Sequence, residues 1–307
     1  MEERISLVMS CYNGSKYITE QLESLKNQTR QIDEVLIFDD GSTDDTVAKV
    51  EKFISDNCLR NWQVHFNAGN YGWQKSFAQG ILKATGDILF LCDQDDIWMP
   101  DKIETMARIM ENKAIGLLVS DLEPLYMSKD ARKLTLRSLG SEYCGKIPCS
   151  QKNYRICRPG CTFAVRTEMA HKCISKYWKE QVPHDALLWE YALITGQLWF
   201  LNQKTIHFRR HGGNSSNNMP HTVKGRLAVI SDEYTRVTIS LRIAEEEEIQ
   251  ANEAVRKVLL RQKAFSENRR RFFEKPSLFR WLKMAKYFDC YAIPRAFFAD
   301  LVIALRK

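Results

Sequence analysis

The first 120 residues alternate between short apolar runs and amphipathic segments, and this alternation restricts the fold more than any other feature. Five apolar runs are predicted to be strands, at residues 5–10, 35–38, 64–66, 88–91 and 116–120. The segments between the runs carry apolar residues at helical spacing, as Ile18, Leu22 and Leu25 do. Regular alternation of strand and helix predicts a mostly parallel, doubly wound α/β sheet with a Rossmann-like arrangement.

Polar residues stand where these predicted strands end. They are, in chain order, Tyr12 and Asn13, Asp39 and Asp40, Asn67, and the acids Asp93, Asp95 and Asp96. In such sheets ligands bind beyond the carboxyl ends of the strands. Three acids side by side repel one another, and a divalent cation with a polyphosphate ligand would explain them. The alternative is an acidic turn that caps the helix predicted to follow from Asp101.

Several classes of protein are disfavoured by what the sequence lacks. No G-x-G-x-x-G follows the first apolar run and no P-loop lysine motif occurs, which argues against nicotinamide enzymes and P-loop NTPases. A phosphatase of the haloacid dehalogenase type would carry its D-x-D after the first strand, whereas here three strand–helix units precede it. A sugar-nucleotide pyrophosphorylase would open with a glycine-rich loop ending in Arg, which this sequence lacks. The nine cysteines form no CxxC pair and predict reduced thiols in a cytosolic protein.

The charge divides the chain into two parts. Residues 222–307 hold 18 Lys and Arg against 11 Asp and Glu, so the whole net charge of +7 belongs to this segment. Its pattern is strongly helical from residue 225 to about residue 273. We therefore expect an α/β domain over residues 1–221 and a basic, aromatic helical region over residues 222–307.

Four motifs in the first 102 residues resemble the inverting family 2 nucleotide-sugar glycosyltransferases, which have the GT-A fold. These motifs are ISLVMSCYNG at residues 5–14, EVLIFDDGSTDDT at residues 34–46, Asn67-x-Gly69, and CDQDDIWMPDK at residues 92–102. A weaker region around His184-Asp185 and residues 208–214 extends the resemblance to about residue 217. The last motif is most similar to the bacterial branch that builds rhamnose-containing polysaccharides. The resemblance implies a nucleotide-sugar half at residues 1–115 and an acceptor half at residues 116–221.

The same resemblance implies roles for single residues. Tyr12 would lie against a pyrimidine ring, Asp40 would accept a hydrogen bond from its N3–H, and Asp93 would contact the ribose. Asp95, with His211, would hold Mn²⁺ or Mg²⁺ between the two phosphates. The remaining expected donor contacts are Asn13, Asn67, Lys75, Arg209 and Arg210. Alternatives stay open: Tyr12 as a core aromatic, Lys75 as a solvated lysine, His211 as a structural residue. For Asp39 the preferred reading is a turn cap.

Inverting transfer also needs a base that takes the proton of the incoming hydroxyl. Asp185 follows Pro183, which interrupts regular structure, and stands at a predicted helix start. The resemblance implies that a carboxylate at this location is the catalytic base. The alternatives are that Asp185 only caps the helix, or that Glu190 is the base. The expected acceptor contacts are Trp98, Gly160 and His184.

The basic region suggests a partner. Residues 256–286 hold eleven Lys and Arg against two acids, with seven aromatic residues near or among them. This mixture is typical of a helix on an anionic membrane surface. Nucleic acid is a weaker candidate for the partner. The structural alternative is that these helices pack on the catalytic domain or in a homodimer.

The function expected from all these features is metal-dependent inverting transfer of a sugar to a polyprenyl-linked glycan. The reaction would belong to bacterial cell-wall or capsular polysaccharide synthesis and take place at the inner face of the cell membrane. The first-choice donor is dTDP-rhamnose, followed by UDP-glucose, UDP-galactose or a UDP-N-acetylhexosamine. A non-catalytic binding module on the same fold is the alternative of a different class.

Overall fold

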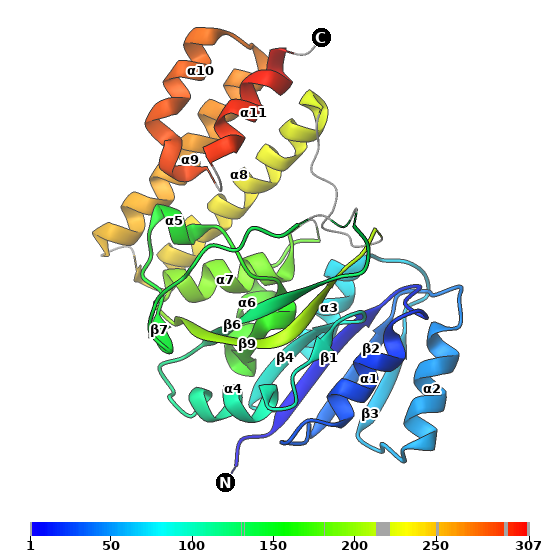
Figure 1. Cartoon of the computed structure of the whole chain (residues 1–307). Helices are drawn as coiled ribbons and strands as arrows, with labels where there is room; N and C mark the ends of the chain where they lie inside the picture. The colour runs from blue at the N-terminus through cyan, green and yellow to red at the C-terminus, as the bar shows by residue number, and fades with distance from the viewer. Residues whose placement is uncertain are drawn as a thin grey trace. The chain divides into compact units, whose positions relative to one another are not determined.

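The chain folds into two units, seen in the computed structural model of Figure 1. The structure describes residues 2–129, 131, 133–180, 182–212, 222–249, 252–291 and 294–305. The first unit comprises Met1–Ile147, Cys157–Trp189 and Gln197–Asn214, and the second comprises Pro148–Ile156, Glu190–Gly196 and Ser215–Lys307. The second unit thus includes two short segments that precede the expected boundary at residue 221.

The first unit contains the alternating strands and helices that the sequence predicts. Its elements are β1 (Ile5–Cys11), α1 (Ile18–Lys26), β2 (Glu34–Asp39), α2 (Thr46–Asp56), β3 (Trp62–Phe66), α3 (Trp73–Lys83), β4 (Ile88–Asp93), β5 (Ile97–Trp98), α4 (Lys102–Met110), β6 (Leu117–Tyr126), β7 (Cys144–Lys146), the 3₁₀ helix η1 (Gly160–Thr162), β8 (Phe163–Arg166), α6 (Thr167–Tyr177), the start of α7 (His184–Ile194) and β9 (Leu198–Arg210). All five expected strands are present, as β1, β2, β3, β4 and β6.

One sheet runs through this unit in the order β3-β2-β1-β4-β8-β6-β9-β5, with β7 paired to β9. The strands from β3 to β4 are parallel to their neighbours. Beyond β4 the sheet is mixed, because β8 runs antiparallel to both β4 and β6 while β6 and β9 are parallel. The expected α/β fold class is therefore confirmed, and the parallel order applies to the strands from β3 to β4.

The central strands are buried on both faces, which explains their continuous apolar sequence. Successive side chains of a strand point to opposite faces. Leu7 on β1 belongs to the same core cluster as Leu22 of α1. Val8, on the other face, lies against Gly80 of α3, where an added Cβ would be 2.4 Å from a Val8 methyl group. Helices thus cover the sheet on both sides and leave its strand ends for a ligand.

The second unit is helical, as expected. Its elements are α5 (Gln151–Tyr154), the end of α7, α8 (Val223–Glu246), α9 (Glu253–Glu274), α10 (Leu278–Met284), the 3₁₀ segment η4 (Ala285–Cys290) and α11 (Pro294–Leu305). The side chains of Thr222 and Asn252 cap α8 and α9 by accepting hydrogen bonds from backbone N–H groups of the first turn. No helix in the described ranges is both long and apolar enough to cross a bilayer.

A buried ion network joins the helices of this unit. Arg269 donates to both carboxylate oxygens of Asp300, at 2.7 and 2.9 Å, and lies 3.2 Å from Glu233. Arg155 lies 2.9 Å from the same Glu233. Burial alone would raise the pKa of Glu233, but the two arginines lower it to about 2. Arg269, in the segment expected to face a membrane, is therefore a packing residue, which corrects that expectation for this side chain.

Candidate active site

The acids after β4 form a compact cluster. The ligand atoms of Asp93, Asp96 and Cys161 all lie within 4.8 Å of one another. Asp96 is fully buried, and its Oδ1 accepts a hydrogen bond from the N–H of Arg209 at 2.9 Å. Burial and the neighbouring charges of Asp95 and Asp185 raise the pKa of Asp93 to about 7. The pKa of Asp96 is raised well above its usual value for the same kind of reason, burial and nearby acids.

The structure brings Asp95 and His211 together, as the metal prediction requires. The Nε2 atom of His211 lies 2.7 Å from Oδ2 of Asp95. The His211 ring is also held against Tyr17, with 4.9 Å between the ring centroids.

The donor set fits Mn²⁺ or Mg²⁺. Carboxylate oxygens, together with an imidazole nitrogen, suit these ions, and a cation would relieve the repulsion that raises the pKa of Asp93. Cys161 fits less well, because burial and nearby Asp96 and Asp93 raise the pKa of its thiol and keep it protonated. Asp95 and His211, with Asp93 beside them, are therefore the residues that could hold the ion.

Arg209 contacts the residues next to the acid cluster. Its guanidinium lies 2.5 Å from the carboxylate of Glu20, donates to the carbonyl of Asp95 at 2.7 Å and packs 4.4 Å from the Tyr17 ring centroid. Arg210 is also almost completely buried, with its guanidinium over the Phe208 ring. Both side chains are thus largely enclosed by protein, and Arg209 holds the backbone at Asp95. Their expected contacts with the diphosphate stay predictions.

Lys102 is the residue of this site that sequence reasoning missed. It is fully buried, donates a hydrogen bond from Nζ to the carbonyl of Cys161 and lies 3.6 Å from the Trp98 ring centroid. Burial lowers its pKa to about 8, although nearby Asp96 favours the charged form. A signal existed in the sequence, because Lys102 is four residues before Met106 on the apolar stripe of α4.

Trp98 is 2% exposed and packs in the core against Phe90, with 5.9 Å between ring centroids. Its expected contact with an acceptor stays a prediction.

Tyr12 is exposed just beyond the end of β1, and its stacking on a nucleobase stays a prediction. Its side chain is 43% exposed, so the alternative of a core aromatic is wrong. The side-chain amide of Gln94 pairs with both backbone groups of Tyr12, accepting from N–H at 2.9 Å and donating to C=O at 3.0 Å. Gly14 makes room for this amide, since an added Cβ would lie 2.1 Å from Gln94 Oε1. Asn13, at φ 47°, accepts from the N–H of Thr43 at 2.8 Å.

The two acids after β2 have separate roles. Asp39 Oδ2 accepts from the backbone N–H groups of Gly41 and Ser42, at 3.1 and 3.0 Å, so the turn cap is confirmed. Asp40 is buried, and its Oδ1 accepts from the side-chain amide of Asn67 at 2.9 Å.

Asp40 also accepts backbone hydrogen bonds from Tyr71 and Gly72, at 2.9 and 2.8 Å, and so fixes the loop that precedes α3. Lys75 on α3 lies 3.3 Å from Glu180 and 4.6 Å from the Tyr71 ring centroid. Its diphosphate contact stays a prediction.

The predicted base and acceptor residues lie together. Asp185 is in the first turn of α7, where its Oδ1 accepts from the N–H of Ala186 at 2.7 Å. A Cβ added to Gly160 would lie 3.2 Å from Asp185 Cβ and 3.5 Å from His184 Nε2, so the buried Gly160 packs closely against both residues. Asp185 is also near enough to Asp93 to raise its pKa.

His184 is buried against aromatic rings and not exposed toward a ligand. It stacks on Phe77 at 4.3 Å and meets Trp73 edge-on at 5.6 Å. Burial lowers its pKa to about 4, so the ring is neutral at physiological pH. Its expected contact with an acceptor stays a prediction.

Glu190 is excluded as a substitute base. It is fully buried in the second unit, its carboxylate lies 2.8 Å from Arg236, and it accepts from Ser240 at 3.4 Å. A carboxylate fixed in this way stabilises the helical unit.

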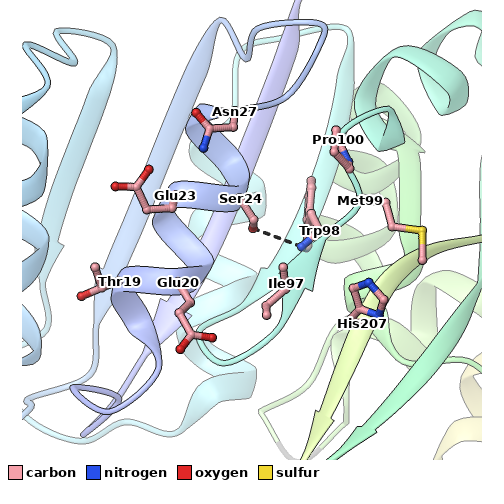
Figure 2. A pocket seen from close by; sticks show the side chains of 10 residues that line it. All are labelled: Thr19, Glu20, Glu23, Ser24, Asn27, Ile97, Trp98, Met99, Pro100 and His207. Carbon is pink, nitrogen blue, oxygen red and sulfur yellow. Dashed lines mark hydrogen bonds between the residues drawn. The ribbon is translucent and has the colours of Figure 1, made fainter.

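A pocket of about 500 Å³ lies between α1 and β5 (Figure 2). It is lined by Thr19, Glu20, Glu23, Ser24, Asn27, Ile97, Trp98, Met99, Pro100 and His207. Its carboxylates are already paired, Glu20 with Arg209 and Glu23 with Lys26 at 3.2 Å. Apart from Trp98, none of the predicted site residues lines this pocket.

An α/β sheet with this acid cluster after β4 and a carboxylate at the start of α7 defines the class of GT-A-like glycosyltransferases. The family model described as glycosyl transferase family 2 matches residues 6–171, and the chain belongs to this family.

Sequence relatives are also named glycosyltransferases. An uncharacterised glycosyltransferase of Nostoc sp. (strain PCC 7120) is 23% identical over 69% of this chain and 66% of its own length. Glycosyltransferase GlyG of Streptococcus pneumoniae is 32% identical over 39% of this chain and 40% of its own length. The matches thus span less than two thirds of these relatives.

Solved structures share the fold over nearly the whole chain. S. aureus TarS (residues 1–349) in complex with UDP-GlcNAc has a TM-score of 0.67 at 17% identity, covering 98% of this chain and 89% of that one. Mannosyltransferase PcManGT from Pyrobaculum calidifontis in complex with GDP-Man and Mn²⁺ has a TM-score of 0.55 at 14% identity, covering 99% and 86%. At these identities the likeness concerns the fold alone.

Proposed function

We propose that this chain is a divalent-metal-dependent, inverting glycosyltransferase that uses a nucleotide sugar as donor. The observation that carries the proposal is the pairing of Asp95 with His211 beside Asp93, together with Asp185 close enough to influence Asp93. Further support comes from fold neighbours that contain UDP-GlcNAc, or GDP-Man with Mn²⁺. A binding module without activity would have no need for both a cation site and a nearby base.

Each part of the reaction has a residue in the site. Tyr12 presents its ring to the nucleobase, and Asp93 contacts the ribose. Asp185 accepts the proton of the acceptor hydroxyl while that oxygen attacks the anomeric carbon. Gly160, which packs closely beside Asp185, is part of the proposed acceptor site. A bound Mn²⁺ or Mg²⁺, held by Asp95 and His211, supplies the positive charge that stabilises the leaving diphosphate.

For the donor, dTDP-rhamnose is the first choice, on the resemblance of residues 92–102 to the rhamnosyltransferase-like branch. UDP-sugars are the second candidate, favoured by the UDP-GlcNAc complex of TarS. The acceptor we propose is a polyprenyl-linked glycan of a bacterial surface polysaccharide, which places the reaction at the inner face of the cell membrane.

The test is a panel of nucleotide sugars incubated with the full chain and Mn²⁺, with release of the nucleoside diphosphate as the readout. We expect dTDP-rhamnose to be hydrolysed fastest, and the release to stop with EDTA. Faster hydrolysis of UDP-glucose, UDP-galactose or UDP-N-acetylglucosamine would replace the first-choice donor. Release from no donor, with no nucleotide binding, would contradict the transferase proposal.

A further inference from the structure

Two neighbouring helices of the second unit, α10 and α11, expose large apolar side chains. Six of these side chains are between 51% and 67% exposed: Leu278, Phe279, Leu282, Phe298, Val302 and Leu305. We call these six residues the α10–α11 face. Soluble proteins rarely expose a contiguous apolar patch of this kind unless it meets a partner.

The packing of the two helices holds this face in place. The Trp281 indole stacks on Phe297 with 4.5 Å between ring centroids, and its Nε1 donates to the Phe297 carbonyl at 2.9 Å. Figure 1 shows α10 and α11 next to each other in the C-terminal unit. Phe298, Val302 and Leu305 follow one another at helical spacing on α11, while Phe297, Asp300 and Ile303 are buried. The exposed stripe is thus the outer side of a helix whose inner side is well packed.

The charges around this face are positive. Residues 275–305 contain five basic residues, Lys275, Arg280, Lys283, Lys286 and Arg295, against two acids. One of the acids, Asp300, is buried against Arg269, and the other, Asp289, lies 2.7 Å from Arg261. Both acids are therefore neutralised from another helix, and the five basic residues keep their charge. The Nζ atom of Lys283 lies 4.3 Å from the ring centroid of Phe279, which belongs to the α10–α11 face.

We propose that the α10–α11 face docks on an anionic lipid bilayer, with its apolar side chains in the interface and the basic residues at the headgroups. Exposed apolar side chains combined with Lys and Arg are typical of helices that lie on such a surface. A second copy of the chain is a poorer occupant, because the same basic residues would then face one another. The docking surface is α10 and α11, and not the Arg269 region of α9. This docking surface belongs to the second unit alone, so the test of membrane docking is independent of the transferase reaction.

The test is co-sedimentation of the full chain with vesicles of phosphatidylglycerol and phosphatidylcholine in equal parts, and with vesicles of phosphatidylcholine alone. We expect binding to the anionic vesicles only, weakened by salt. The double variant Phe279→Ser/Phe298→Ser should bind at least about tenfold more weakly, because its apolar contacts are lost. The affinity of the double variant Lys283→Gln/Lys286→Gln for the anionic vesicles should fall roughly fivefold for each charge removed.

Matched controls use the same chemistry outside the face. Leu82→Ser replaces an exposed leucine of α3 in the first unit, and Lys257→Gln replaces an exposed lysine of α9. Both controls should bind vesicles as the unchanged chain does. The proposal is overturned if the unchanged chain does not bind anionic vesicles, or if Phe279→Ser/Phe298→Ser binds equally well with an unchanged melting temperature. A dimer in sedimentation equilibrium that this double variant dissociates, without vesicle binding, would assign the face to self-association.

Discussion

Two carboxylates on α7, Asp185 and Glu190, show how burial separates a catalytic role from a structural one. Asp185 is partly exposed, whereas Glu190 is completely buried beside Arg236. A base must reach its substrate, and only Asp185 can do so. The environment of each side chain thus selects between two acids that the sequence left open.

The variant Asp185→Asn should lower turnover by roughly 10²–10⁴, the usual effect of losing a general base. Its affinity for the nucleoside diphosphate should stay unchanged, because the amide keeps the size of the side chain. Single-turnover rates and calorimetric titration measure the two quantities. As the matched change, Glu190→Gln should lower the free energy of unfolding by about 3 kcal/mol, because Arg236 loses its buried partner, with little effect on turnover of the folded protein. Equal losses of binding and turnover in Asp185→Asn would point to a structural cap.

His184 should make stability depend on pH. Burial lowers its pKa to about 4, against an ordinary value of 6.5. Between these values the unfolded chain binds a proton that the folded chain does not, so the free energy of unfolding falls as the pH falls through this window. The variant His184→Phe keeps an aromatic ring beside Phe77 and cannot titrate. Between pH 6.5 and pH 4, the free energy of unfolding of this variant should fall by up to about 3 kcal/mol less than that of the unchanged chain.

Urea denaturation at several pH values measures this difference. Identical pH profiles for the two proteins would show that His184 does not titrate with a lowered pKa.

At the scale of elements, the sequence predicts what is local and misses what depends on distant partners. The apolar runs of β1, β2 and β4 and the helical spacing of α1 to α3 identify these elements directly, because burial on both sheet faces leaves a continuous apolar sequence. The edge strand β3 is only partly buried. The direction of β8 could not be predicted, since its three apolar residues and Arg166 fit a parallel or an antiparallel neighbour equally well.

Buried arginines show the same limit for side chains. Arg209 pairs with Glu20, 189 residues away, and Arg269 pairs with Asp300, 31 residues away. A sequence pattern shows neither partner, so both arginines appear solvent-exposed or ligand-binding. Tyr12 and Asp95 could be placed near one another because they follow β1 and β4, parallel neighbours whose ends lie at one edge. Asp185, at the start of α7, could be named only from the family resemblance.

The buried network of α9 and α11 gives a prediction for the helical unit. Arg269→Glu places a carboxylate beside Asp300 and Glu233, and should lower the free energy of unfolding by about 3–5 kcal/mol. Arg271→Glu, at an exposed position two residues further on, should change it by about 0.5 kcal/mol or less. Thermal and urea unfolding measure both variants. Similar stability of the two would contradict the buried network.

At the scale of the whole molecule, fold and sequence likeness cover different parts of the chain. The family model ends at residue 171, while the TarS fold likeness covers 97–98% of the chain. The second unit therefore follows a shared architecture with a sequence of its own. The second unit holds the excess of basic charge, and the proposed cation site lies in the charge-balanced part.

The central claim is that Asp95 holds a divalent cation through which the nucleotide binds, and its most direct measurement is calorimetric titration of UDP and dTDP into the full chain. Mn²⁺ should tighten binding of at least one nucleotide about tenfold or more over EDTA, since losing a charged contact costs on the order of 1.4 kcal/mol or more. In Asp95→Ala this difference should vanish while the melting temperature is kept. Equal affinity of the unchanged chain in Mn²⁺ and in EDTA, or an undiminished Mn²⁺ effect in Asp95→Ala, would contradict the account.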